Sequence, residues 1–91
     1  MVTRDDRMTP RPAREPRLDL LEACWRMQTP NGRILSCGIY GTDAPGVEVR
    51  VSYGPEDLLR SQVAIEIGAA REIAVEWRKA VIDKGGFTEL G

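Results

Sequence analysis

Two cysteines and eleven arginines are the side chains of this chain that invite a chemical interpretation, because the sequence contains no histidine. Without histidine, the commonest general base and the commonest metal ligand in proteins are both missing. Cys24 and Cys37 form no CxxC motif, and the chain has no GxGxxG, GxxxxGKS/T or HExxH motif. We therefore expect a protein that is not an enzyme and that holds neither a metal ion nor a cofactor.

The two thiols are expected to be reduced and unreactive. Cys37 alternates in step with Leu35 and Ile39, which favours a small buried residue over a nucleophile. Cys24 is expected to be more exposed, with arginines as the only neighbours that could lower the pKa of its thiol. The two cysteines are predicted to point to opposite faces of a sheet, an arrangement that does not suit a disulfide.

Arg26, Arg50 and Arg60 are the constellation that we single out, since all three fall on one face of the predicted sheet. A solvated face partly neutralised by Glu48 is the simplest explanation. The same face could instead stack on a second copy, or bind an anionic partner such as single-stranded nucleic acid. The positions predicted to interact there are Arg26, Ile34, Tyr40, Glu48, Arg50, Ser52, Leu58 and Arg60.

The composition describes one small globular protein of 91 residues, 42% hydrophobic and 30% charged, with a formal net charge of −1. A nearly neutral charge argues against a dedicated duplex-binding protein, because phosphate binding needs many gathered cations. No run approaches the ~18 apolar residues of a membrane span, and the N-terminal residues lack the apolar stretch of a secretory signal, so we expect a cytoplasmic protein without a membrane partner. So small a core favours a homo-oligomer, with a dimer as the simplest form.

Residues 1–17 are expected to form a disordered tail, and residues 18–91 a single α+β domain. The tail contains five arginines, three prolines and three acids, with no apolar period. A solvated leader is the simplest interpretation, and an arm that contacts an acidic partner is the alternative.

The elements that must position the arginines centre on residues 47–53, where apolar and polar side chains alternate without a break. Residues 19–28 could form a short helix by composition, but Trp25 and Met27 alternate up to the turn sequence Pro30-Asn31-Gly32. Proline and glycine in this order favour a hairpin turn, followed by a strand over residues 33–40. Three successive strands are thus predicted.

The segment Leu58 to Ala64 is predicted as a fourth strand. Val63, Ile65 and Ile67 are β-branched and spaced by two, and Gly68 would weaken a helix interior. The alternative is three strands and one long helix, because a proline followed by two acids at residues 55–57 is also typical of a helix start. From about Glu66 to Lys84 an apolar face recurs at helical spacing, and two glycines then end the helix.

The alternation also predicts the register of an antiparallel meander followed by a helix, ββββα. Opposed pairs are Met27 with Leu35, Ile39 with Val49, and Val51 with Ser61. The face covered by the helix then collects Trp25, Met27, Leu35, Cys37, Ile39, Val49, Val51, Tyr53, Leu59 and Val63. Rows across the uncovered face are predicted to read Arg26, Ser36, Ser52, Arg60 and Cys24, Gly38, Arg50, Gln62.

The ββββα order resembles that of the Whirly proteins and of small single-strand-binding coactivators, in topology and without shared motifs. The resemblance implies a dimer that uses a curved sheet on nucleic acid. From the residues themselves we expect a non-catalytic cytoplasmic protein that self-associates through its open sheet face and serves as a binding or regulatory module. A single-stranded nucleic-acid binder is the alternative, and a small-molecule enzyme is a third.

Overall fold

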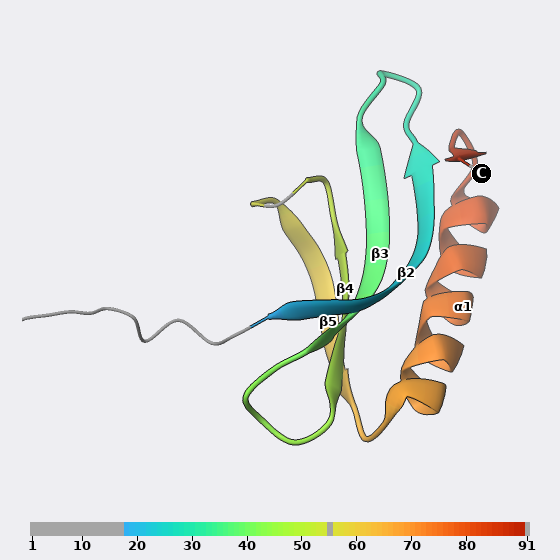
Figure 1. Cartoon of the computed structure of the whole chain (residues 1–91). Coiled ribbons are helices and arrows are strands. Elements are labelled where there is room, and N and C mark those ends of the chain that lie inside the picture. Colours follow the sequence, from blue (N-terminus) through green and yellow to red (C-terminus); the bar gives the residue numbers. More distant parts are fainter. Residues whose placement is uncertain (1–17, 55, 91) are drawn as a thin grey trace, which may run out of the picture.

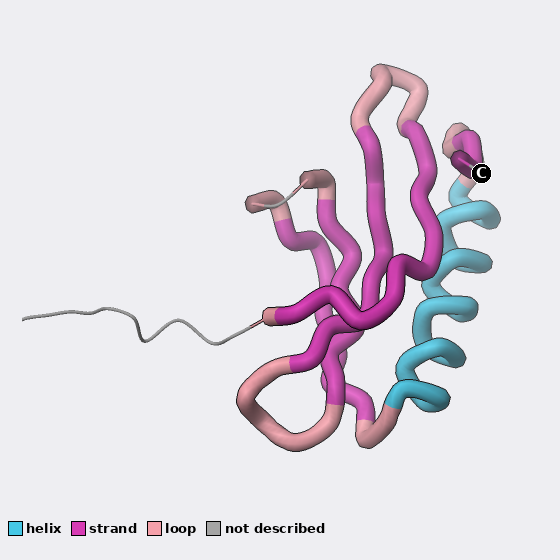
Figure 2. Tube along the Cα trace, in the orientation of Figure 1, coloured by secondary structure: helices cyan, strands magenta, loops and turns pink. Residues whose placement is uncertain are grey.

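The computed structural model describes residues 18–54 and 56–90, which form one antiparallel sheet covered on one face by a helix (Figures 1 and 2). The strands are β2 (Asp19–Gln28), β3 (Ile34–Gly41), β4 (Val47–Ser52), β5 (Leu58–Ala64) and β6 (Thr88–Leu90), and the helix is α1 (Ile67–Lys84). The order across the sheet is β5-β4-β3-β2-β6. The predicted α+β fold of four strands and a helix is confirmed, while the predicted tail, residues 1–17, lies outside the described residues.

The first hairpin has the predicted register from its turn to Trp25, and the second hairpin has the predicted register as well. Pro30 and Gly32 turn the chain between β2 and β3, with Gly32 at a φ of 90° and a hydrogen bond of 2.8 Å from the backbone N of Thr29 to the carbonyl of Arg33. Met27 pairs with Leu35 in this hairpin, and Ile39 with Val49 and Cys37 with Val51 in the next one. Alternation and turn chemistry were sufficient to predict both.

The pairing of β4 with β5 differs from the prediction by one residue. Val51 pairs with Arg60 instead of Ser61. The paired part of the hairpin starts with Ser52 opposite Leu58, and an irregularity between Val51 and Ser52 then makes Leu59 an extra residue in β5. Val63 therefore lies on the uncovered face and is 69% exposed, and Leu59 is 54% exposed. Ala64 takes the buried position between β5 and the helix instead.

Strand β2 carries two similar irregularities. Ala23 pairs with Gly38 and Trp25 with Cys37, so Cys24 is an extra residue in the pairing, and the predicted row that joins Cys24 to Gly38 is wrong. Bulges bend a strand and increase its twist. In Figure 1 the first half of β2 runs across the sheet rather than along it. The side chain of Leu20, in this half of β2, covers Gly38. A Cβ atom at position 38 would lie only 2.9 Å from a methyl carbon of Leu20.

Helix α1 begins where the sequence predicts. Its first turn explains how Gly68, which is unfavourable in a helix interior, can be part of the helix. The Glu66 carboxylate is the N-cap and accepts hydrogen bonds from the backbone N of Gly68 (2.6 Å) and of Ala69 (3.2 Å). A Cβ atom on Gly68 would lie 2.9 Å from that carboxylate. Gly68 thus belongs to the capped end of the helix rather than to its interior.

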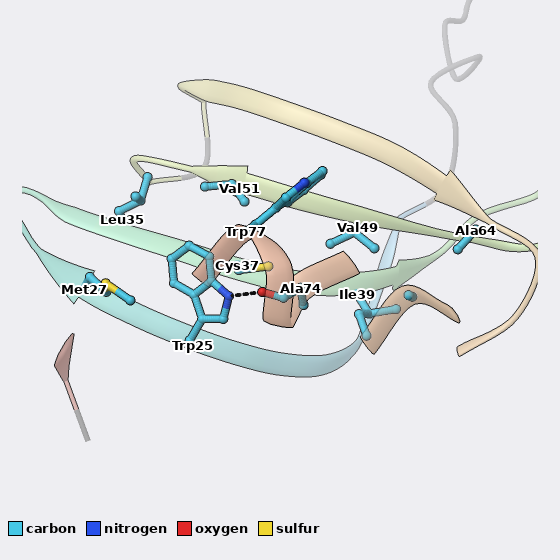
Figure 3. Close-up of a cluster of buried hydrophobic side chains, with 11 residues drawn as sticks. Trp25, Met27, Leu35, Cys37, Ile39, Val49, Val51, Ala64, Ala74 and Trp77 are labelled. Atoms are coloured by element: carbon cyan, nitrogen blue, oxygen red, sulfur yellow. Dashed lines mark hydrogen bonds between the residues drawn. The ribbon is translucent and has the colours of Figure 1, made fainter. Parts of the chain in front are cut away.

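The core lies between the sheet and α1 (Figure 3). Ala70 and Ala74 are buried on the helix, and small side chains there let its backbone approach the strands. The indole Nε1 of Trp25 donates a buried hydrogen bond of 2.8 Å to the backbone carbonyl of Ala74. The core residues from the sheet are Trp25, Met27, Leu35, Cys37, Ile39, Val49, Val51 and Ala64.

The short strand β6 was not predicted. It pairs antiparallel with residues 26–28 of β2, and its Glu89 carboxylate accepts a hydrogen bond of 2.9 Å from Nε of Arg78 on α1. Three residues carry too little periodicity to be recognised in a sequence, and their partner lies some sixty positions away. β6 covers the C-terminal end of β2, so the edge of the sheet is partly protected on that side.

Replacing the helix cap should destabilise the protein measurably. We expect Glu66→Ala to lower the free energy of unfolding by about 1 kcal/mol, because two backbone N–H groups lose their acceptor. Urea unfolding followed by circular dichroism measures this, with Glu72→Ala, an exposed glutamate of the same helix, as the control. Equal stabilities of the two variants would show that the carboxylate does not cap the helix.

Candidate functional site

The face of the sheet opposite α1, here called the open face, is formed by three rows of paired side chains. The rows read Leu20, Tyr40, Glu48, Val63; then Ala23, Gly38, Arg50, Ser61; and then Arg26, Ser36, Ser52, Leu58. The positions from β3 and β4 are those that alternation predicts. From the two bulged strands, Arg26 and Leu58 lie where they were predicted, whereas Ala23 and Ser61 take the places predicted for Cys24 and Gln62, because a bulge exchanges the faces of the residues beyond it.

A hollow of about 380 Å³ lies on the open face. Strands β3, β4 and β5 form it, and the residue just before β2 reaches its rim. Its lining residues are Leu18, Ser36, Tyr40, Arg50, Ser52, Gly54 and Leu58. One guanidinium group, three hydroxyl groups and two leucine side chains thus surround a space within the size range of small-ligand sites.

Four of the eight predicted interaction residues line this hollow, namely Tyr40, Arg50, Ser52 and Leu58. Glu48 lies beside it, and its Oε1 is 4.0 Å from Nη1 of Arg50. The Arg50 guanidinium is 5.9 Å from the centroid of the Tyr40 ring. The ion pair between Arg50 and Glu48 is longer than a charge-assisted hydrogen bond, so the Arg50 guanidinium can turn toward another anion at little cost in free energy.

Two of the predicted residues lie on the open face outside the hollow, and one lies elsewhere. Arg26 is exposed, and Ile34 is 37% exposed beside the β2–β3 turn. Arg60 is on the helix side of the sheet, where its guanidinium stacks 4.5 Å from the centroid of the Trp77 ring. Its predicted place on the open face is wrong, because the bulge at Leu59 reverses the faces of β5.

The sequence interpretation missed two apolar residues of the open face. Leu18 lines the hollow and is 40% exposed, and Leu20 is 58% exposed. Their spacing by two before the predicted strand was a usable signal. Only the bend of β2, however, brings Leu18 near Leu58, since the two residues are three strands apart in the sheet.

The two cysteines meet on the helix side, contrary to the prediction of opposite faces. Cys37 is buried in the core and Cys24 packs against it, so the two thiols are neighbours. Burial raises the pKa of the Cys37 thiol to about 12, helped by the neighbouring Cys24. Burial also raises the pKa of Cys24, and the nearby Glu22 carboxylate adds to this while Arg71 opposes it.

The open-face hollow offers hydroxyl groups, one guanidinium and apolar side chains to a ligand. Among the described residues, no acid lines this hollow to serve as a base for its serines. Within residues 18–54 and 56–90 no cluster of three or more Cys, Asp or Glu side chains could hold a metal ion. In the same part of the chain, no helix has the length and apolarity needed to cross a membrane.

Comparisons with known proteins add no assignment. No protein family, no curated protein and no solved structure matches this chain.

The raised thiol pKa values predict slow alkylation. At neutral pH only a minute fraction of either thiol is the reactive thiolate, and the rate should rise about tenfold per pH unit below the pKa. Mass spectrometry after iodoacetamide treatment of the native protein measures this, with the urea-unfolded protein as control. Modification of native Cys37 at the unfolded rate at neutral pH would contradict the buried thiol pair.

Proposed function

We propose that the protein is a non-catalytic module that self-associates through its open sheet face and acts by binding or regulation. The observation that carries the proposal is the exposed apolar area on that face. Leu20 is 58% exposed, Leu58 44% and Ile34 37%, from three different strands. Helix α1 packs against the opposite face and cannot cover them, so a second copy offers the burial that the fold itself lacks.

The charges of the open face suit a symmetric dimer. In an interface with a dyad axis the same patch meets itself, so each cation needs an anion within its own patch. Arg50 and Glu48 provide such a pair, with side chains only 25% and 21% exposed. Each arginine can exchange its long ion pair for one with the glutamate of the other copy. The small core supports the same proposal, because domains of this size often gain stability by association.

A single-stranded nucleic acid remains the second candidate, supported by one observation. The Tyr40 ring and the Arg50 guanidinium lie together in the hollow, which is the combination that stacks a base and contacts a phosphate. The support is weaker than the sequence indicated, because Arg60 lies on the other side of the sheet and Glu48 neutralises Arg50 in part.

A charge placed on the open face should prevent self-association. We expect Leu58→Glu to yield a monomer where the unmodified protein is a dimer at micromolar concentration, because each interface would bury two unpaired carboxylates. Light scattering after size exclusion gives the mass. The matched control is Val75→Glu, a helix residue with a similar exposure of 49%. A monomeric unmodified protein, or a dimer that survives Leu58→Glu, would count against the proposal.

Nucleic-acid binding has a separate readout. If it occurs, anisotropy of a labelled oligothymidylate should report an affinity that falls steeply with salt, and Arg50→Ala should reduce both the affinity and the salt dependence. Arg71→Ala is the control, since Arg71 lies on α1 and pairs with Glu22 at 2.8 Å. Absence of any salt-dependent signal would remove this candidate.

A further inference from the structure

We propose that the free edge of β5, with the groove between β5 and α1, binds an extended segment of a partner protein that carries an apolar side chain and a carboxylate. The groove lies on the helix side of the sheet, and the edge of β5 borders both faces. The groove shares no lining residue with the hollow of the open face, so the two sites can be tested separately.

The edge of β5 is available for pairing. The strand bonds to β4 on one side and has no neighbour on the other among the described residues. All six residues from Leu58 to Val63 are exposed. Natural sheets protect such edges with charges, prolines or bulges. Here the bulge at Leu59 affects only the start of the strand, and residues 61–64 remain regularly paired and unprotected.

The one charged side chain of β5 does not shield the edge. Arg60 folds over the helix side, where its guanidinium stacks on Trp77 at 4.5 Å. The remaining side chains between residues 58 and 65 are uncharged. An extended peptide could thus approach the outer N–H and C=O groups of β5 and add a strand to the sheet.

A groove of about 330 Å³ runs beside this edge, between strands β4 and β5 and the C-terminal half of α1. Its apolar lining includes Leu59, Trp77, Val81 and Phe87. The volume is at the lower end for a small-molecule site, and it suits one or two side chains of a peptide. Strand addition supplies main-chain hydrogen bonds, and a neighbouring groove of this kind supplies selectivity.

The charge of the groove indicates the chemistry of the partner segment that it binds. Of the residues that the structure describes, Arg60 and Lys84 are the two ionic groups that line the groove, and no carboxylate lines it. Neither cation forms a salt bridge within the described part of the chain, and the nearby Asp57 is held by Arg33 at 2.7 Å. A guanidinium stacked on a ring still presents its N–H groups at its edge, where a carboxylate can accept two of them.

A second copy of β5 is a poorer occupant than an acidic segment. Residues 58–65 contain no acid, so a paired β5 would bring another Arg60 to a surface that already carries two cations. A partner segment with an apolar residue near an aspartate or glutamate matches both the groove and its charge.

The test is selection of random nine-residue peptides, displayed in a library, on the immobilised full-length protein. Enriched peptides should share an apolar residue close to an acid, and synthetic copies should bind in fluorescence anisotropy. Changing the acid to lysine should weaken binding about tenfold. Methylation of alternate backbone nitrogens should abolish it, because a strand then loses its donors.

Variants of the protein locate the site. Lys84→Glu and Arg60→Glu should each lower the affinity of the protein for the acidic peptide about tenfold. Lys79→Glu, a charge reversal on the outer side of the same helix, should have no effect. Since Arg60→Glu also removes the stacking on Trp77, Lys84→Glu is the decisive variant if the former fails to fold.

Several outcomes would overturn the proposal. The first is that no peptides are enriched. The second is that Lys84→Glu leaves the affinity for the peptide unchanged. The third is that the backbone-methylated peptide binds as tightly as the unmethylated one. Light scattering separates the two proposals, because Leu58→Glu tests self-association and Lys84→Glu should leave the oligomeric state unchanged. A dimer that Lys84→Glu or an enriched peptide dissociates would show that a second copy occupies the edge, and would also overturn the proposal.

Discussion

The buried hydrogen bond from Trp25 to the carbonyl of Ala74 is the contact on which the rest of the arrangement depends. It joins β2 to a helix forty-nine residues later, and its net contribution is about 0.5–1.5 kcal/mol beyond the burial of the indole. This hydrogen bond requires the helix backbone to lie close to β2. Ala70 and Ala74 permit that distance because neither carries a large side chain. The helix is thereby held over the strands that supply the core, and Ala64 is the only residue of β5 that becomes buried there.

Both proposed surfaces follow from this placement. One helix of eighteen residues covers one face of the sheet, so the other face keeps its leucines and the hollow around Arg50 in contact with solvent. On the covered side, the helix leaves a groove along β5, where Trp77 forms part of the wall. The two surfaces are separated by the thickness of the sheet, and they differ in character. On the open face Arg50 lies beside Glu48, whereas the two cations of the groove form no salt bridge with any described residue.

Bulges decided which residues reached each surface. Cys24 and Leu59 are each an extra residue in their pairings. The first insertion brings the two thiols together on the core side and bends β2 over Gly38; the second moves Arg60 from the open face to the groove. Neither a cysteine nor a leucine in a sequence predicts a bulge. The choice depends on how Leu20, Trp77 and Ala64 pack with partners that are distant in the chain, and local periodicity contains no information about them.

The sequence alone determined strands β2 to β5 and helix α1, the pairing of β2 with β3 next to their turn, the pairing of β3 with β4, and the apolar face of α1. Each of these rests on signals within a few residues, such as the alternation at Val49 and Val51, the turn at Gly32 or the helical spacing up to Trp77. Only the tertiary structure decided the register of β5, the meeting of the cysteines, the pairing of β6 and the side of the sheet on which Arg60 acts. The physical reason is the strict period of two in a strand. One inserted residue exchanges its faces, so a small packing preference moves a whole set of side chains from one surface to the other.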